Sequence, residues 1–149
     1  MRKRNDSLRL VPPVHRATHR IGLYLQGRRD LGVSQGEAHV LAHLWDAGPC
    51  TVGRLHAAFA HRRSTLTGIL DRLEAAGLVR RELRPADRRS FLVTLTPRGR
   101  SRARRVRAAL GELEARVARR VSPAELAGFE AVARALAQEA AGGGEKEAP

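Results

Sequence analysis

The spacing of apolar residues changes from a helical to a strand period within one central stretch, residues 51–96. Between residues 62 and 73, apolar side chains recur three and four positions apart, so they share one face of a predicted helix. These residues are Leu66, Ile69, Leu70 and Leu73. Gly77 then stops the helix, because glycine adopts the left-handed conformation beyond a helix end at little cost. The alternation in residues 91–95 (FLVTL) predicts a strand.

A second predicted strand, residues 78–84, precedes this one, and the turn between the two is rich in arginine. Arg84, Arg88 and Arg89 lie in or beside the turn, together with Asp87. A two-stranded ribbon with a basic tip, placed after a helix–turn–helix pair, is the arrangement of a winged helix. The predicted fold class is therefore mainly α with a small β-wing.

Helix start and stop signals frame the segments before residue 62. Ser34 followed by Glu37 is a capping box that opens a helix, and Gly48 with Pro49 closes it. Thr51 can cap the next helix. The predicted buried face of that next helix consists of Val52, Leu55 and Phe59.

Apolar stripes also run along three predicted helices at the two ends of the chain. The first helix begins at Pro12 and Pro13 and is expected to end near Arg29 or Asp30. The stripes comprise Val14, Thr18, Ile21 and Leu25; Val106, Leu110, Leu113 and Val117; and Leu126, Phe129, Val132, Ala133 and Leu136. No predicted sheet covers them, so they need partner helices, either in a second copy or in an intrachain three-helix bundle.

Several motifs of the central stretch carry a family resemblance. Residues 51–59 read TVGRLHAAF, residues 62–81 read RRSTLTGILDRLEAAGLVRR, and residues 87–100 read DRRSFLVTLTPRGR. The motifs G-L-V-x-R, D-x-R and L-T-x-x-G are specific, and the match runs without gaps from about residue 33 to residue 100. The chain resembles the multiple antibiotic resistance regulator (MarR) family.

This resemblance implies a homodimeric, ligand-responsive transcription factor, usually a repressor. It implies one MarR-type domain over residues 1–149, with a winged helix-turn-helix at 33–96. Dimerisation helices are expected at 12–31 and 97–141, and flexible tails at 1–11 and 142–149. The expected partners are a pseudo-palindromic double-stranded DNA operator and a second copy of the chain.

The predicted DNA contacts fall into three groups. Ser64, Thr65 and Thr67 are candidates for contacts to bases, and Arg62, Arg63 and Arg72 for contacts to phosphates. In the wing, Arg84 and Arg88 are expected on phosphates, while the resemblance implies that Arg89 enters the minor groove and that Asp87 orients it. For Arg80 and Arg81 we weigh phosphate contacts equally with support of the wing through carboxylates.

Two positions depart from the family pattern. Relatives usually carry glycine, an apolar residue and an Asp or Ser cap where this chain has Ala60, His61 and Arg62. Gly68 stands inside the helix where relatives often carry a basic residue. These departures affect the expected DNA sequence preference rather than the fold.

The net charge of +13 favours a polyanionic partner, and half of the 28 Lys and Arg residues lie in residues 78–120. Ordinary solvated surface charge is the simpler interpretation of part of this net charge. Charge alone would also suit a nonspecific architectural DNA-binding protein, which is the alternative function. We find no convincing nucleophile–base set, so an enzyme is not expected.

The resemblance also implies a small-molecule pocket between the dimerisation helices and the winged helix. Tyr24, His39, His43 and Trp45 are its candidate residues, for a small aromatic or anionic ligand, although core packing is the slightly favoured interpretation of Trp45. No cofactor is expected.

Metal-triggered or redox-triggered sensing on the same scaffold remains an alternative. His15 and His19, like His39 and His43, have the i, i+4 spacing of zinc ligands, but solvated or hydrogen-bonded histidines are the default. Cys50, the only cysteine, excludes an intrachain disulfide and is expected to be a buried thiol rather than an oxidation sensor. Without a signal peptide or an apolar run of membrane length, we expect a cytoplasmic protein with no membrane partner.

Overall fold

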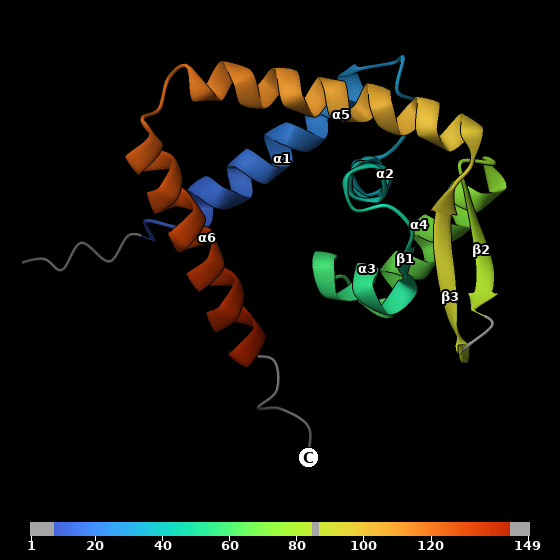
Figure 1. The fold of residues 1–149 in the computed structure, drawn as a ribbon. Helices are drawn as coiled ribbons and strands as arrows, with labels where there is room; N and C mark the ends of the chain where they lie inside the picture. Colours follow the sequence, from blue (N-terminus) through green and yellow to red (C-terminus); the bar gives the residue numbers. More distant parts are fainter. Residues whose placement is uncertain (1–7, 85–86, 144–149) are drawn as a thin grey trace, which may run out of the picture. The chain divides into compact units, whose positions relative to one another are not determined.

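The computed structural model describes residues 8–84 and 87–143, and Figure 1 shows its elements. The described helices are α1 (Val11–Gly27), α2 (Gln35–Ala47), α3 (Val52–Phe59), α4 (Arg63–Ala75), α5 (Pro97–Ala118) and α6 (Pro123–Gly143). The described strands are β1 (Cys50–Thr51), β2 (Val79–Arg84) and β3 (Asp87–Leu95). The predicted fold class, mainly α with a small β-wing, is confirmed. The chain divides into two compact units, residues 1–109 and 110–149, and the division falls within α5.

The first unit is built around one apolar core to which all of its elements contribute. Its largest fully buried side chains are Leu25, Leu31, Val40, Leu41, Leu55, Leu66, Leu70, Leu73, Val79, Val93 and Val106. The predicted inner face of α4 is confirmed, because its four apolar residues are all buried. Of the predicted face of α3, Leu55 is fully buried and Val52 and Phe59 are half-buried.

The described strands form one antiparallel sheet in the order β1-β3-β2. Cys50 of β1 pairs with Val93, and Arg80 of β2 pairs with Thr94. The register between β2 and β3 shifts between Leu83 and Arg84, close to the tip of the ribbon. The short strand β1 therefore joins the wing to the start of α3.

The helix ends follow the predicted capping signals. The capping box of Ser34 and Glu37 is present in full, and Thr51 Oγ1 accepts the Arg54 N–H at 3.2 Å. Gly77, with φ +67°, ends α4: its N–H donates to Glu74 O and the Leu78 N–H to Leu73 O, both at 2.9 Å.

The first helix, in contrast, ends at Gly27 rather than near Arg29 or Asp30. Arg28 leaves the helical conformation, with ψ 80°, and its N–H donates to Leu25 O in a tightened last turn. Glycine has a low helix propensity, which explains the earlier end.

A close backbone contact fixes the start of α5 against the start of β2. Thr96 Oγ1 donates to Gly77 O at 2.7 Å and accepts the Gly99 N–H at 2.9 Å. A Cβ atom at Gly99 would lie 1.7 Å from Leu78 O, a backbone atom. The L-T-x-x-G motif thus places a glycine where the helix touches the backbone just before β2.

The second unit contains the last turns of α5 and the whole of α6. A capping box opens α6: Ser122 Oγ accepts the Glu125 N–H at 3.3 Å, and Glu125 Oε2 accepts the Ser122 N–H at 2.7 Å. Its apolar residues stay open to solvent in the single chain: Leu126 is 48% and Phe129 60% exposed. Between residues 110 and 141, no side chain that the structure describes is buried.

Candidate nucleic-acid interface

The N-terminal half of α4 presents a polar face to solvent. Arg63, Ser64, Thr65 and Thr67 are all exposed, while the opposite face of the helix is buried in the core. Their side chains point outward because the apolar residues at helical spacing fix the rotation of the helix. The sequence-predicted contacts of α4 up to Thr67 therefore share one accessible face.

The start of α4 has open backbone donors. Arg62 is the N-cap residue, and within the described part of the chain no side chain accepts a hydrogen bond from the first turn. The first N–H groups of a helix lack intrahelical partners and carry partial positive charge. Together with the exposed Arg62 and Arg63, this end of the helix can receive an anion such as a phosphate.

The turn between α3 and α4 is made by an unusual residue. Ala60 has φ +50° and ψ 25°, the left-handed conformation that favours glycine, and its N–H donates to His56 O at 3.0 Å. His61 stacks on Phe59 with ring centroids 5.9 Å apart, and His43 of α2 meets Phe59 edge-on at 5.3 Å. These aromatic contacts support the turn that Ala60 makes.

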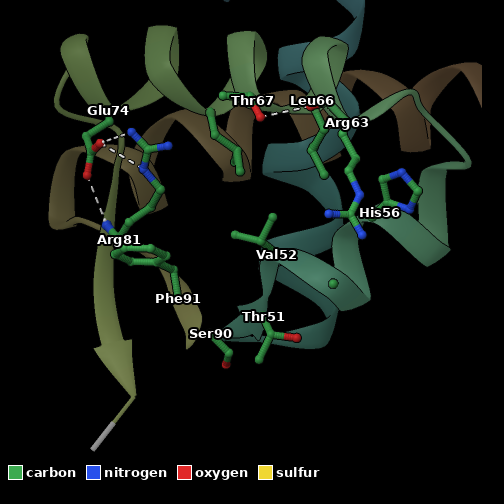
Figure 2. Close-up of a pocket in the computed structure, with 12 residues that line it drawn as sticks. Thr51, Val52, His56, Arg63, Leu66, Thr67, Glu74, Arg81, Ser90 and Phe91 are labelled. Carbon is green, nitrogen blue, oxygen red and sulfur yellow. Dashed lines mark hydrogen bonds and ion pairs between the residues drawn. The ribbon is translucent and has the colours of Figure 1, made fainter. Parts of the chain in front are cut away.

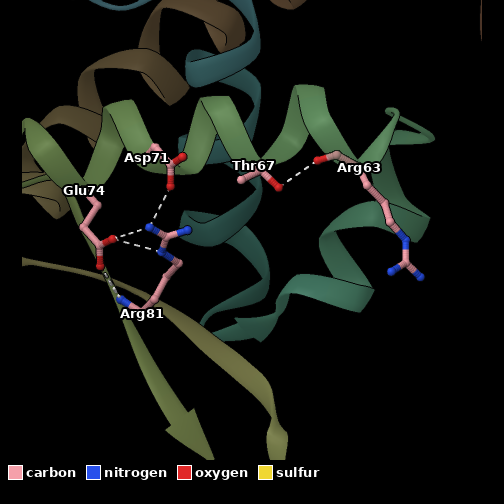
Figure 3. Close-up of polar contacts among 5 residues, drawn as sticks. All are labelled: Arg63, Thr67, Asp71, Glu74 and Arg81. Atoms are coloured by element: carbon pink, nitrogen blue, oxygen red, sulfur yellow. Dashed lines mark hydrogen bonds and ion pairs between the residues drawn. The ribbon is translucent and has the colours of Figure 1, made fainter.

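Only part of the hydrogen-bonding capacity of the Thr67 hydroxyl is used within α4. Its hydroxyl donates to Arg63 O at 2.8 Å, as Figure 3 shows, which satisfies its donor. A hydroxyl oxygen also has two acceptor lone pairs, so Thr67 remains able to accept from a base edge or a water.

Arg81 of β2 ties the wing to the C-terminal half of α4 (Figure 3). Its Nη2 lies 2.7 Å from Asp71 Oδ1 and 2.5 Å from Glu74 Oε2, and its Nε donates to Glu74 Oε2 at 2.9 Å. The backbone N–H of Arg81 adds a hydrogen bond to Glu74 Oε1 at 3.1 Å. Of the two interpretations of this residue, the structure supports the one in which carboxylates hold it.

The ion pairs shift the pKa values of the groups involved. Hydrogen bonds from the Arg81 side chain and N–H lower the pKa of Glu74, and the same contact raises the pKa of Arg81. With its side chain 26% exposed, Arg81 is held more firmly than a surface arginine. The recognition surface of α4 and the wing are thus coupled through one guanidinium.

Arg72 makes a second ion pair, on the other side of α4. Its Nε lies 2.7 Å from Glu37 Oε1 of α2. Burial raises the pKa of Glu37, but hydrogen bonds from the Ser34 N–H and from Arg72 outweigh it and lower the pKa overall. The Arg72 side chain is still 59% exposed, so the phosphate contact predicted for it stays a prediction alongside this pairing.

A cavity of about 900 Å³ separates α4 from the wing and the start of α3 (Figure 2). Its lining includes Arg63, Thr67, Arg81, Ser90 and Phe91. The Ser90 hydroxyl is buried and has no hydrogen-bond partner among the described residues. The cavity therefore offers a polar occupant both cationic and uncharged partners, and no motif in the sequence predicted it.

The wing tip is described only in part. Arg84 is exposed, and its backbone pairs with Asp87. The side chains of Asp87, Arg88 and Arg89 lie outside the described part of the structure, so their predicted roles stay predictions. At the base of the ribbon, Arg80 Nε lies 3.1 Å from both Glu82 Oε1 and Thr94 Oγ1.

The four residues predicted for a ligand pocket make separate contacts. Tyr24 donates its hydroxyl to Ala109 O of α5 at 3.0 Å, while His43 contacts Phe59. His39 is half-buried, and burial, reinforced by the nearby His61, lowers its pKa. Trp45 is 41% exposed and lines a different groove, at the base of the wing. The expected core packing of Trp45 is thus only partial.

The residues considered for sensing show no metal site. Among the described residues, no group of three or more His, Cys, Asp or Glu is arranged to hold a metal ion. Cys50 is buried as expected, and burial raises the pKa of its thiol, which disfavours the reactive thiolate. Within the described segments, no helix is both long enough and apolar enough to span a membrane.

The pair α3–α4 followed by the β2–β3 ribbon makes this chain a winged helix-turn-helix protein. The sequence profile of the MarR family matches residues 33–91. Over these residues the chain is similar to the MarR family. Among curated protein sequences no match was found.

Solved structures agree with this assignment. The chain is 28% identical to Bordetella bronchiseptica BpsR, covering 89% of this chain and 96% of that one with a TM-score of 0.73. A probable transcriptional regulator from Pseudomonas aeruginosa is 25% identical, covers 86% and 96%, and has a TM-score of 0.69. Staphylococcus aureus MepR, solved as a DNA complex, is 18% identical, covers 89% and 99%, and shares the fold with a TM-score of 0.77.

Proposed function

We propose that this protein is a homodimeric, sequence-specific DNA-binding regulator, most simply a repressor that a small molecule releases. The observation that carries the proposal is the exposed polar face of α4, whose uncapped N-terminus lies beside Arg62 and Arg63. The coupling of α4 to the wing through Arg81 supports it, because two DNA-reading elements then move as one body.

In this proposal α4 enters the major groove of double-stranded DNA. Ser64, Thr65 and Thr67 contact base edges, while Arg62 and Arg63 contact phosphates and set the position of the helix. The wing follows the backbone and reaches the neighbouring minor groove, where Arg84 and Arg88 bind phosphate. Arg89, oriented by Asp87, inserts into the groove and reads its width.

A second copy of the chain completes the protein in this proposal. The dimerisation helices lie in residues 12–31 and 97–141, on either side of the winged helix-turn-helix at 33–96. The exposed apolar residues of α6 support this arrangement, since a stripe of that kind is normally covered by a partner. Two copies related by a two-fold axis would bind a pseudo-palindromic operator. The centres of its two half-sites would lie about one helical turn apart.

Release by a small molecule is supported by one relative and by the cavity. The BpsR structure is described as showing regulation of its DNA binding by 6-hydroxynicotinic acid. In this chain the cavity beneath α4 is lined by Arg81, the residue that couples α4 to the wing. An anionic occupant there would compete with Glu74 for Arg81 and change the angle between the two DNA-reading elements.

The test is a binding measurement by fluorescence anisotropy at about 150–200 mM salt, with the DNA upstream of the protein's own gene and a shuffled duplex of equal composition. We expect a preference of about a thousandfold or more for the specific duplex. Thr65→Ala should lower this preference, whereas Arg104→Ala, an exposed arginine of α5, should not. Equal affinities for several upstream duplexes and their shuffled forms would contradict the proposal.

The net charge of +13 favours one alternative, a nonspecific architectural DNA-binding protein. That protein would bind all duplexes with the same steep dependence on salt, because counterion release ignores sequence. Replacing Arg89 with alanine separates the two cases. In a specific regulator, the substitution should lower the affinity mainly for an A·T-rich operator. In a nonspecific protein, it should lower the affinities for the operator and the shuffled duplex slightly and by the same factor.

A further inference from the structure

Three histidines gather around one phenylalanine at the turn between α3 and α4. The ring of Phe59, at the end of α3, stacks on His61 with centroids 5.9 Å apart and meets His43 of α2 edge-on at 5.3 Å. His39, one helical turn before His43, is half-buried and close enough to His61 for charges on the two rings to interact. These three residues, which we call the histidine cluster, join α2 to the turn in front of α4.

Few other contacts hold this turn closed. Ala60 adopts the left-handed conformation at φ +50°, and its N–H donates to His56 O at 3.0 Å. Arg62, the N-cap of α4, accepts no side-chain hydrogen bond from the first turn among the described residues. A strained residue next to an uncapped helix start opens more easily than the core does. The contacts between Phe59 and the histidine cluster therefore matter for keeping the turn closed.

The charged neighbours of the histidine cluster do not compensate a positive charge on it. They are His56 on α3, Arg62 and Arg63 at the start of α4, and Glu37 and Asp46 on α2. Both carboxylates are already engaged, Glu37 by Arg72 and Asp46 by Arg107. Within the described part of the chain, only the charge of His61 shifts the pKa of His39. Protons added to the cluster thus create like charges side by side.

The state of His39 depends on pH in the range where histidines titrate. Burial is the largest cause that lowers the pKa of His39, and the charge of His61 adds to it. The stability that depends on neutral His39 is therefore fully present above the ordinary histidine pKa of 6.5 and is lost as pH falls through the lowered value. Opening the turn separates the two rings and exposes His39 to water, so acid favours the open turn.

We propose that the histidine cluster is a proton-sensitive switch, which keeps the turn between α3 and α4 closed while its rings are neutral and opens the turn in mild acid, when His39 and His61 both carry charge. The turn fixes where α4 begins, so its opening releases the first turn of that helix. The switch is a property of the free protein. Its consequence for DNA, a loss of sequence preference in acid, rests on the proposed function.

Amide hydrogen exchange of the full-length protein, without DNA and with a chelator present, tests the switch at about pH 8 and about pH 5, on either side of the ordinary histidine pKa. The N–H groups of Ala60 and Leu66, which donate to His56 O and Arg62 O, report opening of the turn. The N–H of Val106, a core residue of α5, reports unfolding of the whole unit. From the higher to the lower pH, the protection factors of the two turn amides should fall by about fivefold or more relative to Val106, the order expected for a pair of like charges near solvent. Equal losses at all three amides would overturn the proposal.

Substitutions then test the charge separately from the ring. His61→Phe keeps a ring against Phe59 and removes the charge, so the turn should stay protected at both pH values. His15→Gln, which replaces an exposed histidine of α1, should keep the full pH dependence. Far-ultraviolet circular dichroism confirms that both variants fold. A pH dependence that persists in His61→Phe, or one that His15→Gln also removes, would overturn the proposal.

Fluorescence anisotropy with the upstream and shuffled duplexes measures the consequence for DNA. The preference of the unchanged protein for the upstream duplex should fall about fivefold or more between about pH 8 and about pH 5, whereas that of His61→Phe should not. Preferences are compared rather than affinities, because protonated histidines attract any duplex. If no preference exists even at the higher pH, the proposed function fails, while the exchange measurement still decides whether the switch exists.

Discussion

The winged helix-turn-helix and the C-terminal segment carry equally regular apolar stripes but differ completely in burial. In α4, the residues at i, i+3, i+4 and i+7 are all buried, with exposures between 1% and 4%. In α6, Leu126, Phe129 and Val132 recur three positions apart and are 37% to 60% exposed. Helical periodicity thus identifies a face that needs covering, but not the molecule that covers it.

The two regions also differ in how closely their backbones approach other elements. Gly99 touches the Leu78 carbonyl, whereas a Cβ at Gly128 of α6 would meet no atom within 4 Å. One glycine is required by packing and the other is not. The same substitution at both positions therefore measures the difference between the regions directly.

Gly99→Ala should have the largest effect on folding. The added Cβ would lie 1.7 Å from Leu78 O, so α5 or β2 must shift, at a cost of about 3 kcal/mol. Gly128→Ala should instead leave stability unchanged or raise it by up to about 1 kcal/mol, because alanine favours a helix. Urea unfolding of both variants checks this, and equal destabilisation by the two would show that the contact at Gly99 is not tight.

Phe129→Glu tests whether a second copy covers the exposed stripe of α6. A carboxylate in the centre of an apolar interface should raise the dimer dissociation constant about a hundredfold, without unfolding the winged helix. Glu130→Gln, one position along and polar before and after, is the matched control. Analytical ultracentrifugation gives the oligomeric state. If Phe129→Glu sediments as the unchanged protein does, the α6 stripe is not the dimer interface.

Local signals in the sequence sufficed for most of the fold. The capping boxes at Ser34 and Ser122 and the glycine stop at Gly77 depend on residues close together in the chain, and all three are present in the structure. The wing followed from a predicted strand before an arginine-rich turn and a period of two after it. The role of Gly99 could not be derived this way, because the carbonyl it touches lies 21 residues earlier and approaches only in the folded state.

The candidate site was less predictable because the partners of its side chains lie on other elements, and some are far away in the sequence. The alternatives for Arg81 could not be separated, since its two carboxylates lie on the preceding helix across the turn at Gly77. Arg72 was assigned to phosphate from its position, and its pairing with Glu37 spans 35 residues. Of the groove at the base of the wing, the sequence indicated only Trp45, because the walls of the groove come from separate elements.

Arg81→Met removes the link between α4 and the wing while keeping an unbranched side chain. We expect a loss of about 1–2 kcal/mol at neutral pH, a range that allows for solvent screening of these partly exposed pairs. DNA affinity should fall as well, because the wing and α4 would then be ordered separately. Arg98→Met, an exposed arginine at the start of α5, is the control.

The effect of Arg81→Met should depend on pH in a defined direction. The pKa of Glu74 is lowered in the folded protein, so its stabilising contribution is present above the ordinary glutamate pKa of about 4.3 and is lost as pH falls through the lowered value. The stability difference between Arg81→Met and the unchanged protein should therefore shrink below about pH 4. A difference that stays constant from neutral to acidic pH would mean that Arg81 stabilises through packing alone.

Ala60→Gly should have the smallest effect on the free energy of unfolding, and it should raise this free energy rather than lower it. Ala60 holds φ +50° at the turn before α4, a conformation that costs a residue with a Cβ roughly 1 kcal/mol and glycine almost nothing. Glycine gains flexibility in the unfolded chain, which offsets part of the benefit, so we expect a rise in stability of up to about 1 kcal/mol, or roughly 3 °C in melting temperature.

Ala57→Gly, an exposed position inside α3, should destabilise by a similar amount, because there the glycine only weakens a helix. Calorimetry on both variants compares one chemical change in two conformations. If both are destabilised alike, the stacking of His61 on Phe59 would be what holds the turn, and the left-handed residue would carry no measurable strain.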